Sequence, residues 1–563
     1  MRPTLLALCA LSLSVWSSGA APESIARTLL GASPPAPPPL ANPLPDTPPA
    51  AAAPPASGPR PVPPGTPSIV LREVRLEGGA GLPKDELAAV YQPFLGYPVT
   101  LADLEEIRYR LTQRLVERGY VNSGAVLEDQ TVADGSVRFR LIAGQLEDIQ
   151  ISGQGRLRAA YLRDRLRPRA DRPFNRAELE ERFQLLLEDP LIDNLQGTLW
   201  PGSAPGRAVL DLRVARARPW EFYLRTDNHR PPSTGAERAY FGGTLRNLTG
   251  YGDALDGYFG IDYQGASPEG ELRYSLPLNG RDTRLWVRWS RNDSALIESP
   301  LADLDIESAT QRIEVGLTQP LWNTLNRQLT LGVLLAWGEN RTWLLDERFS
   351  FSPGVVEGEH RVSAVRFVQE YRQRAAGQAF SLRSVFSYGL EAFDATRHRG
   401  NEPDSRFFAW LGQGSYVRQL NDRDWRLIAR GAVQLAGERL LPLEQLAIGG
   451  INTVRGYREN EQVNDSGYAA TLELRVPLWR GAGFADLPQM LEAAFFGDVG
   501  AAWRHDEFSA HDTLWSAGVG LNWLVAERFR AELYWAHPFE KPLPTATHNA
   551  QDDGLHFMAQ WNF

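Results

Sequence analysis

Apolar and polar residues alternate along most of the chain from about Arg218 to its C-terminus. In residues 284–291, leucine, valine and tryptophan occupy one set of alternate positions, and arginine and serine occupy much of the other. Residues 513–523 repeat this period of two, which places successive side chains on opposite faces of a β-strand. About sixteen such segments can be distinguished. The pattern predicts a single large antiparallel sheet over residues 217–563.

Three features favour a membrane-spanning barrel over the alternative, a soluble β-sandwich. The alternating region runs for roughly 350 residues without a break, which is large for one sandwich domain. Charged residues recur on the face opposite the apolar one, as a wet lumen permits, and Trp and Tyr recur near strand ends, as interface girdles do. The chain also ends on an aromatic residue, Phe563, that closes an amphipathic strand. We therefore predict a transmembrane β-barrel of about 16 antiparallel strands preceded by two α+β domains.

The first of these α+β domains is expected at residues 69–144. Thr100 is followed three residues later by Asp103, the spacing of a capping box at a helix start. Gly119 is placed to end that helix. Asp134 and Gly135 form a turn signal between two later strands. The apolar stripe of the helix is Leu104, Ile107, Leu111 and Leu115.

The second α+β domain is expected at residues 145–216 and repeats the same layout. Asn175 and Glu178 have the capping-box spacing again, and Asp189 with Pro190 is placed to end the helix. The helix stripe is Leu179, Phe183 and Leu186. Each domain is long enough for a small core, and together they form an internal repeat.

The N-terminal region is expected to divide into three parts. Residues 1–20 have the positive start, short apolar run and small residues of a secretory signal peptide, which would carry away Cys9, the only cysteine. Residues 21–32 fit a short amphipathic helix. Residues 33–68 are rich in proline and alanine and predict an extended linker, either a plain spacer or a tether that lets the preceding helix dock at a distance.

Composition excludes several functions. The net charge of -9 argues against nucleic acid as a partner. No run of eighteen apolar residues follows the signal, so no transmembrane helix is predicted. Hydrolase, metalloprotease and phosphate-loop motifs are missing from the sequence, so we expect no enzyme and no cofactor. His505 and His511 are a weak metal pair in a loop-like segment, and we expect no metal site there.

The stretch GGINTVRGYREN, residues 449–460, stands out within the barrel region. Its glycine content and polarity predict a loop. From the residues alone, Arg455 would be an ordinary exposed arginine of that loop. A later segment, FFGDVGAAW, carries Asp498 between glycines on an alternating strand.

The order of these segments resembles the TpsB transporters of two-partner secretion, which belong to the wider superfamily that includes the BamA insertase. GGINTVRGYREN is similar to the VRGY loop motif of the family, and FFGDVGAAW is similar to its F-x-D-x-G strand motif. DGSVRFRLIAGQLEDIQISG resembles the junction between the two POTRA domains of the family, and LRTDN with the following STG resembles its first strand pair. Two POTRA-like repeats favour TpsB over BamA-like insertases.

The resemblance implies a protein-secretion pore in the outer membrane of a Gram-negative bacterium, with its POTRA domains in the periplasm. The implied partner is a large, unfolded exoprotein with an N-terminal secretion domain. Outer-membrane lipid and the barrel assembly machinery are further implied partners. Two alternatives stay open: an assembly factor that inserts other barrel proteins, and a passive pore or receptor. Residues 21–32 would form a possible plug, although a short one.

Client binding is expected in the POTRA domains, where an extended chain could add to a sheet edge. The alternative is that these repeats only stiffen the barrel entrance. Individual binding residues cannot be assigned from the sequence. A run of arginines could meet an acidic client or lipid headgroups, or could be a solvated face: Arg156, Arg158, Arg163, Arg165, Arg167 and Arg169.

The resemblance also implies a functional loop motif and a partner motif on the barrel wall. A loop around residues 445–466 would fold into the barrel, with Arg455 aimed at Asp498 in a bidentate ion pair. Gly456 would allow a sharp turn, Tyr457 would contact the wall, and Gly497 and Gly500 would leave room for the loop. The implied site residues are Val454, Arg455, Gly456 and Tyr457 in the loop, and Phe496, Asp498 and Gly500 on the wall.

Overall fold

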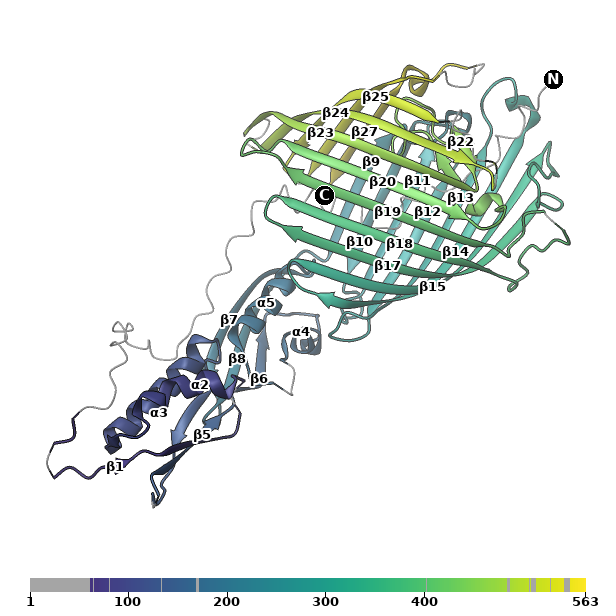
Figure 1. Ribbon diagram of the computed structural model, residues 1–563. Coiled ribbons are helices and arrows are strands. Elements are labelled where there is room, and N and C mark those ends of the chain that lie inside the picture. Colours follow the sequence, from purple (N-terminus) through teal and green to yellow (C-terminus); the bar gives the residue numbers. More distant parts are fainter. Residues whose placement is uncertain are drawn as a thin grey trace. The chain divides into compact units, whose positions relative to one another are not determined.

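The computed structural model describes residues 61–563, except for residues 64, 80, 133, 169–171, 401, 483–486, 506, 508–512, 527 and 541–546. The signal peptide and short helix expected at 1–20 and 21–32 therefore lie outside the described residues, as does most of the linker expected at 33–68. The described chain forms two compact units that meet in sequence at Arg218 and Pro219. Figure 1 traces both units.

The N-terminal part of the first unit is a small α+β fold. A three-stranded sheet has the order β2 (Glu73–Glu77), β5 (Ser136–Ile142), β4 (Gly124–Leu127), with β2 and β5 parallel. The helices are α2 (Lys84–Tyr91) and α3 (Leu101–Glu117), with the 3-10 turn η1 (Gln92–Phe94) after α2. Strands β1 (Ile69–Val70) and β3 (Pro98–Val99) form a separate pair. The predicted stripe of α3 is fully confirmed, because all four residues are buried in the core of this fold.

The second α+β fold follows directly. Its sheet has the order β6 (Gln145–Ser152), β8 (Arg207–Arg216), β7 (Ile192–Pro201), and β6 runs parallel to β8. Helices α4 (Ala159–Leu166) and α5 (Arg176–Leu187) pack on it. The stripe expected on α5 is confirmed, since Leu179, Phe183 and Leu186 are all buried.

In the two α+β domains, one predicted capping box is confirmed, the other is wrong, and two short helices were not predicted. Thr100 and Asp103 form the predicted capping box. Asn175 caps α5, but it accepts a bond from the Ala177 amide and forms no capping box with Glu178, whose carboxylate is instead 2.6 Å from Arg182. Helices α2 and α4 were not predicted, because eight residues are too few for a clear period of 3.6.

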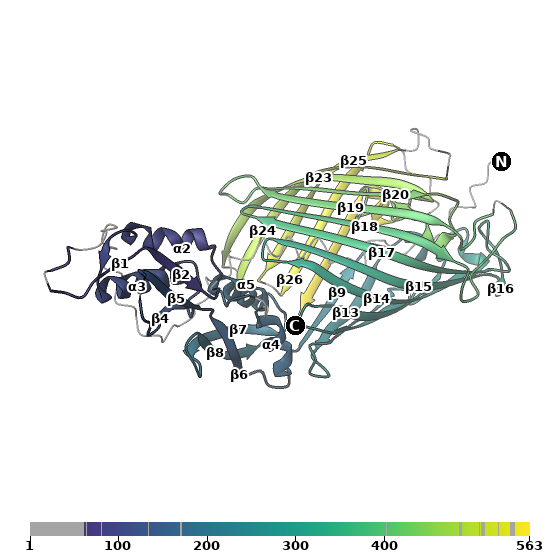
Figure 2. The ribbon, with the colours of Figure 1, turned by 60° about the horizontal axis from the view of Figure 1, so that its bottom comes forward.

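The second unit is a closed antiparallel β-barrel of 16 wall strands, as predicted. Each strand pairs with its neighbour along the wall, and β27 pairs with β9 to close it. Figure 1 and Figure 2 show β17, β18, β19 and β20 side by side in this wall. The wall strands are β9 (Trp220–Asp227), β10 (Arg238–Arg246), β11 (Ala254–Asp262), β12 (Glu269–Pro277), β13 (Arg284–Ala295), β14 (Ile306–Asn323), β15 (Arg327–Leu344), β17 (Glu359–Ala375), β18 (Gln378–Leu390), β19 (Phe408–Gln419), β20 (Arg426–Ala436), β23 (Ser466–Ala482), β24 (Pro488–Trp503), β25 (Leu514–Val525), β26 (Phe529–Pro538) and β27 (Leu555–Asn562).

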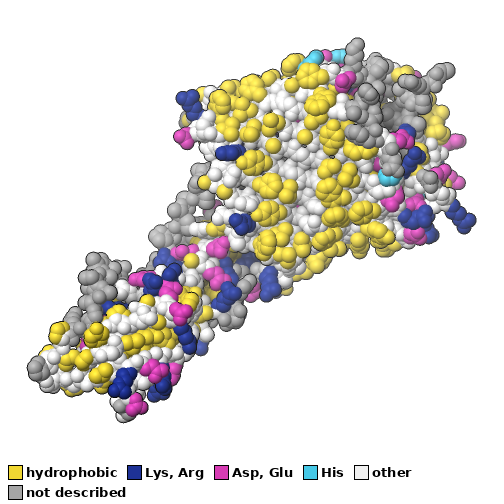
Figure 3. Space-filling model, viewed as in Figure 1, with side chains coloured by type: hydrophobic (Ala, Val, Ile, Leu, Met, Phe, Trp, Pro, Cys, Tyr) yellow, Lys and Arg dark blue, Asp and Glu magenta, His cyan; other side chains and the backbone are white. Residues whose placement is uncertain are grey.

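The alternation predicted from the sequence separates the two faces of this wall. On β25, Trp515, Val519 and Leu521 are exposed, whereas Ser516 and Asn522 are buried toward the interior. Apolar side chains cover much of the visible outer face of the barrel in Figure 3. An apolar outside and a polar inside are the arrangement of a barrel surrounded by lipid.

The connections between strands have two lengths. At one end of the barrel they are short turns such as 324–326 and 376–377. At the other end they are long loops such as 391–407 and 437–465. Outer-membrane barrels have short periplasmic turns and longer extracellular loops, so the loop end faces outward. The small elements of the loops are η2 (Pro232–Thr234), η3 (Ala302–Leu304), β16 (Glu347–Arg348), η4 (Pro442–Glu444), β21 (Leu446–Ile448), β22 (Gln462–Asn464) and η7 (Ala550–Asp553).

Among the described residues, no helix combines the length and hydropathy needed to cross a membrane.

Candidate functional site

The loop 437–465 connects β20 to β23 and carries the motif singled out in the sequence. It begins earlier than the expected residue 445, because η4 already belongs to it. Strands β21 and β22 pair as a small hairpin that holds the motif between them. The motif therefore sits on a folded loop rather than on an extended one.

Gly456 turns the chain sharply at the tip of the motif. Its φ is +90°, a conformation that side-chain-bearing residues rarely adopt, and a Cβ built on it would lie 3.0 Å from the Ala536 carbonyl oxygen on β26. The backbone of the loop at Gly456 therefore packs directly against the backbone of β26. Val454, two residues earlier, is fully buried.

Arg455 binds Asp498 of β24 through both sides of its guanidinium. Nε donates to Oδ2 and Nη2 donates to Oδ1, each at 2.8 Å, and the Arg455 amide donates to Oδ2 at 3.1 Å. The arginine side chain is 4 % exposed and the aspartate side chain 0 %. This is the bidentate geometry in which a guanidinium matches a carboxylate most strongly.

A second carboxylate, Glu473 of β23, completes the pairing. Arg455 Nη1 donates to Glu473 Oε2 at 2.7 Å, and Arg475 Nε donates to Glu473 Oε1 at 2.6 Å. Two arginines thus meet two carboxylates, so the buried cluster is electrically balanced. Burial disfavours the charge of Arg455, but its bonds with Asp498 and the nearby acidic charges outweigh burial and raise the pKa of Arg455. We call Arg455, Glu473, Arg475 and Asp498 the charge cluster.

Aromatic rings cover the charge cluster. The Arg455 guanidinium lies 3.3 Å from the ring centroid of Phe496 and 5.1 Å from that of Tyr534. Tyr534 also accepts a bond from Arg475 at 3.3 Å and donates to Asn522 at 3.0 Å. Stacking and exclusion of water strengthen the ion pairs, because both lower the local dielectric constant.

Of the other residues expected at this site, Tyr457 and Gly500 contribute to the contact between loop and wall, and Gly497 does not. Tyr457 donates to the Trp515 carbonyl at 3.0 Å. A Cβ on Gly500 would lie 2.9 Å from Val454, so Gly500 does make room for the loop. Gly497 was expected to do the same, and that expectation is wrong. It occupies the outward set of alternate positions on β24, and the nearest atom to its Cβ position is the Ser516 carbonyl oxygen at 3.9 Å.

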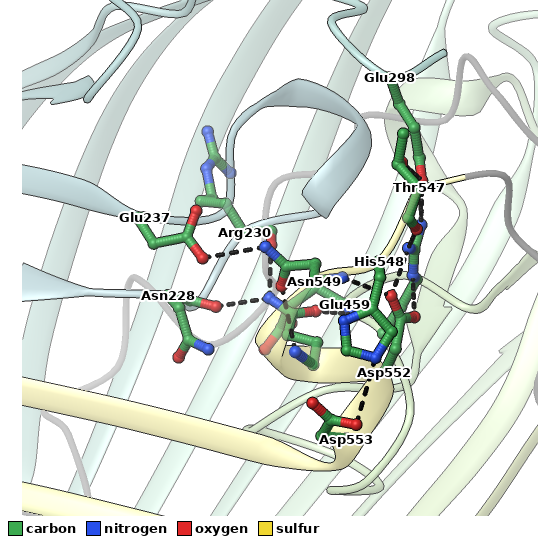
Figure 4. A network of polar contacts seen from close by, with 12 residues as sticks. Asn228, Arg230, Glu237, Glu298, Glu459, Thr547, His548, Asn549, Asp552 and Asp553 are labelled. Carbon is green, nitrogen blue, oxygen red and sulfur yellow. Dashed lines mark hydrogen bonds and ion pairs between the residues drawn. The ribbon is translucent and has the colours of Figure 1, made fainter. Parts of the chain in front are cut away.

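Arg458 extends the same loop toward two extracellular loops. Its Nη1 donates to Glu298 Oε1 at 2.8 Å, and its Nε and Nη2 donate to Asp552 at 2.5 and 2.7 Å. Glu298 belongs to the β13–β14 loop and Asp552 to η7 in the β26–β27 loop. Figure 4 shows Glu298, Thr547 and Asp552 converging in this network. Arg458 thereby joins three loops at the outer end of the barrel.

Glu459, beside it, is partly buried against the same network (Figure 4). Its carboxylate accepts a bond from the Ile451 amide at 2.7 Å, and its amide donates to Gln551 at 2.9 Å. Burial raises the pKa of Glu459 to about 7, with a contribution from the charge of Asp227. The loop tip therefore carries a carboxyl group that titrates near neutral pH.

The base of the loop has its own ionic anchor. Glu444 of η4 accepts two bonds from Arg366 of β17, at 2.8 and 2.9 Å. Arg312 of β14 donates to the Leu443 carbonyl. The loop is thus bound to the lumenal wall at its base and its motif, and to two neighbouring loops through Arg458.

Sequence reasoning missed Glu473, Arg458 and Glu444. The signal for Glu473 was its inward register, because Glu473 and Arg475 share alternate positions of a strand whose other face is apolar. No local pattern marks the partners of Arg458, which lie 160 and 94 residues away in the chain.

The arginine run and the histidine pair considered in the sequence lie only partly within the described residues. In the arginine run, Arg165 stacks on Tyr161 at 3.6 Å and Arg163 donates to the Ile149 carbonyl at 3.5 Å, so these two belong to the domain itself. Arg156, Arg158 and Arg167 are exposed, and Arg169 is outside the described residues. His511, of the weak metal pair with His505, also lies outside the described residues.

A closed barrel of 16 strands, two preceding α+β domains and a long loop bound inside the lumen together define an outer-membrane transporter of the POTRA-barrel type. Comparison with family models agrees with this class. Residues 206–523 match the model described as haemolysin secretion/activation protein ShlB/FhaC/HecB, and residues 69–144 match the ShlB-type POTRA domain. The chain belongs to the ShlB/FhaC/HecB family.

Individual relatives are distant but cover most of the chain. The outer membrane transporter CdiB of Dickeya dadantii is 22% identical over 83% of this chain and 82% of its own length. The heme/hemopexin transporter protein HuxB of Haemophilus influenzae is 22% identical, with 82% of each chain covered. The solved structure of CdiB from Escherichia coli superposes with a TM-score of 0.67 at 20% identity, covering 90% of this chain and 93% of that chain.

Membership of this family establishes the general activity. The family consists of outer-membrane transporters that secrete partner exoproteins by two-partner secretion, with their POTRA domains in the periplasm. The expected location in the outer membrane and the expected secretion function are confirmed at this level.

Proposed function

We propose that the chain recognises a large, unfolded exoprotein in the periplasm through residues 69–144 and 145–216, and passes it outward through the barrel 217–563. Loop 437–465 acts as the movable element of this pore. The observation that supports this role most is the charge cluster around Arg455, which holds the loop to the wall through ion pairs.

Ion pairs of this kind suit a loop that must be held in one position and also released. Separating a buried ion pair loses its electrostatic attraction. Both partners regain hydration when they reach water, so the net free-energy cost of separation is modest. Bidentate geometry meanwhile allows only one register between Arg455 and Asp498. The ion pairs therefore fix the position of the loop, and apolar loop residues such as Leu443, Ile448 and Val454 add packing against the wall.

Client recognition by the two α+β domains is supported by their sheet edges. Strands β2 and β4 border one sheet, and β6 and β7 border the other. An extended chain can add to such an edge by main-chain hydrogen bonds, with little demand on its sequence. The alternative is that the domains only stiffen the barrel entrance. Removing them would then leave the client able to bind.

Further parts of the proposal concern the partners of the chain, its chemistry and its N-terminal segments. The exoprotein carries an N-terminal secretion domain, outer-membrane lipid surrounds the apolar outer face, and the barrel assembly machinery inserts the chain. The net charge of -9 makes nucleic acid an unsuitable partner. The chain acts as a pore and not as an enzyme, and it needs no cofactor. Residues 1–20 act as the signal peptide, 21–32 as a possible plug, and 33–68 as the linker.

Two other functions are separable from this one by a single comparison. An assembly factor of the same superfamily would insert other barrel proteins, and a passive pore or receptor would export nothing. We would compare the proteins of the culture medium and of the outer membrane with and without this gene. Loss of one very large secreted protein from the medium supports the proposal. A general fall in outer-membrane barrel proteins would indicate an assembly factor, and unchanged protein patterns would indicate a passive pore.

A further inference from the structure

A second arginine-rich region lies on a different part of the lumenal wall. A cavity of about 400 Å³ is bordered by wall strands from β12 to β20 and by the base of loop 437–465. Six arginines and four glutamates line it, so the formal charges leave an excess of two positive charges. We call this space the arginine cavity.

The carboxylates of the arginine cavity are already engaged. Glu314 accepts a bond from Arg288, and Glu444 is bound by Arg366. Glu370 lies 3.4 Å from Arg383, and Glu271 lies 3.8 Å from Arg288. These glutamates are therefore not available to neutralise the remaining arginines.

The unpaired groups of the cavity are all of one kind. Among the described residues, each buried side-chain atom of its lining that has no hydrogen-bond partner is an N–H donor. They include the Nε groups of Arg273 and Arg312 and the indole Nε1 of Trp286. A buried donor without a partner is costly, so this set of donors favours a ligand that supplies acceptor oxygens.

Arg273 lies between charges of opposite sign. It stands directly opposite Arg288 in the β12–β13 register and opposite Asp256 in the β11–β12 register, and only the like-charge pair with Arg288 is unfavourable. Arg288 has Glu314 as a partner, whereas Arg273 pairs with no carboxylate in the described part of the chain. Its guanidinium lies over the Trp286 ring, 4.9 Å from the centroid. An anion beside Arg273 and Trp286 would supply acceptor oxygens for both unpaired donors.

We propose that the arginine cavity is a binding site for a carboxylate, centred on Arg273 and Trp286. A guanidinium fork and a neighbouring indole N–H fit a planar two-oxygen acceptor. The carboxylate can come from an acidic side chain of the exported polypeptide or from a small free carboxylate. The first source rests on the proposed export function, whereas the site itself does not.

The test uses the purified full-length protein and isothermal titration calorimetry. Three ligands are titrated: sodium citrate, an eight-residue Gly/Ser peptide with interspersed glutamates, and the same peptide with glutamines. The variants are Arg273→Gln and the control Arg291→Gln. Arg291 lies on the neighbouring strand β13, is exposed, pairs with Asp293 and does not line the cavity. Heat-shifted migration on gels checks that each variant barrel is folded.

The wild-type protein should bind citrate, and Arg273→Gln should weaken that binding about tenfold or more, because one charge-assisted contact is lost. Arg291→Gln should bind as the wild type does. Arg273→Lys keeps the charge without the fork and should fall between them. Binding of the glutamate peptide but not of the glutamine peptide would identify the exported chain as the source, and binding of citrate alone would identify a free ion.

The proposal is overturned by equal affinity of the wild type and Arg273→Gln, by equal binding of the two peptides without citrate binding, or by no binding of citrate and the glutamate peptide to the wild type. None of these results depends on export. A failure of the export function would appear in the culture medium instead, so the two failures remain distinguishable.

Discussion

Two arginine-rich regions of the same lumenal wall differ in how completely their charges are paired. In the charge cluster, Arg455 and Arg475 meet Glu473 and Asp498, and no buried side-chain nitrogen or oxygen of these four residues lacks a hydrogen-bond partner. In the arginine cavity, Arg273 forms no ion pair with a carboxylate of the described part of the chain, and several buried N–H groups are unpaired. The wall residues of both regions occupy alternate, inward-facing positions of the strands, and loop 437–465 adds Arg455 to the charge cluster.

The difference indicates two uses of the same side chain. A saturated, balanced cluster has nothing left to offer a ligand, so its role is to hold two parts of the protein together. An unsaturated cluster stores unfavourable energy that a suitable ligand can relieve. Substitutions in the charge cluster should therefore lower the stability of the docked loop. Substitutions in the arginine cavity should instead weaken ligand binding and leave the stability of the protein nearly unchanged.

Arg455→Ala should have the largest effect. It leaves Asp498 buried without its arginine and Glu473 paired with Arg475 alone, and breaking one side of a buried pair costs roughly 3–5 kcal/mol. Loop docking should be lost and secretion should fall about tenfold or more, while the barrel still folds. Secreted protein in the medium is measured against Arg397→Ala, an exposed loop arginine. Normal export by Arg455→Ala would remove the assigned role.

Arg458→Ala should have an intermediate effect, because its ion pairs are partly exposed and lie at the loop tip. Loops 296–305 and 539–554 lose their shared partner, so we expect faster cleavage of these loops by added protease on intact cells. Asp553→Asn is the matched control, since its pair with His548 is exposed. Equal cleavage rates in both variants would mean that Arg458 does not hold the outer loops.

A smaller effect is expected from pH at Glu459. Its pKa is raised from about 4.5 to about 7 in the docked loop, so the docked state binds the proton more tightly than the released state. Docking should then be strongest below about pH 4.5 and weaken as the pH rises through about 7. The unfolding midpoint of the wild type should fall by roughly 2 °C between pH 5 and pH 8. Glu459→Gln should abolish that component, and an unchanged pH slope would contradict it.

Arg273→Gln should change stability least. It breaks no ion pair among the described residues, and the lost repulsion from Arg288 offsets the lost attraction to Asp256, so the unfolding midpoint should change little. Thermal unfolding of Arg273→Gln beside Arg455→Ala tests the contrast directly. A large loss of stability in Arg273→Gln would show that the two arginine regions do not differ as described.

The sequence predicted the barrel well because alternation is a local signal. The outward positions of β25 follow directly from a period of two, and the same holds for the stripe of α3, whose period is 3.6. Domain order and strand number came from the same reasoning. Short helices such as α4 carry too few residues for this signal, so they were missed.

The candidate site was less predictable because its residues meet across the barrel. The pairing of Arg455 with Asp498 came from family resemblance, since 43 residues separate them and no spacing rule connects them. The misassigned Gly497 shows the limit of a motif without register, because a shift of one position turns a side chain from the lumen to the lipid. The alternation shows only that Glu473 faces the lumen. Its pairing with Arg455 depends on the position of the loop, which no local pattern gives.

The most direct test of the account is a double-mutant cycle of secretion with Arg455→Ala, Asp498→Ala and the pair together. Each single variant should reduce the amount of secreted protein, and the double variant should be no worse than either one, because the two residues act as one contact. Strictly additive losses would contradict the account and would mean that Arg455 and Asp498 contribute to secretion independently.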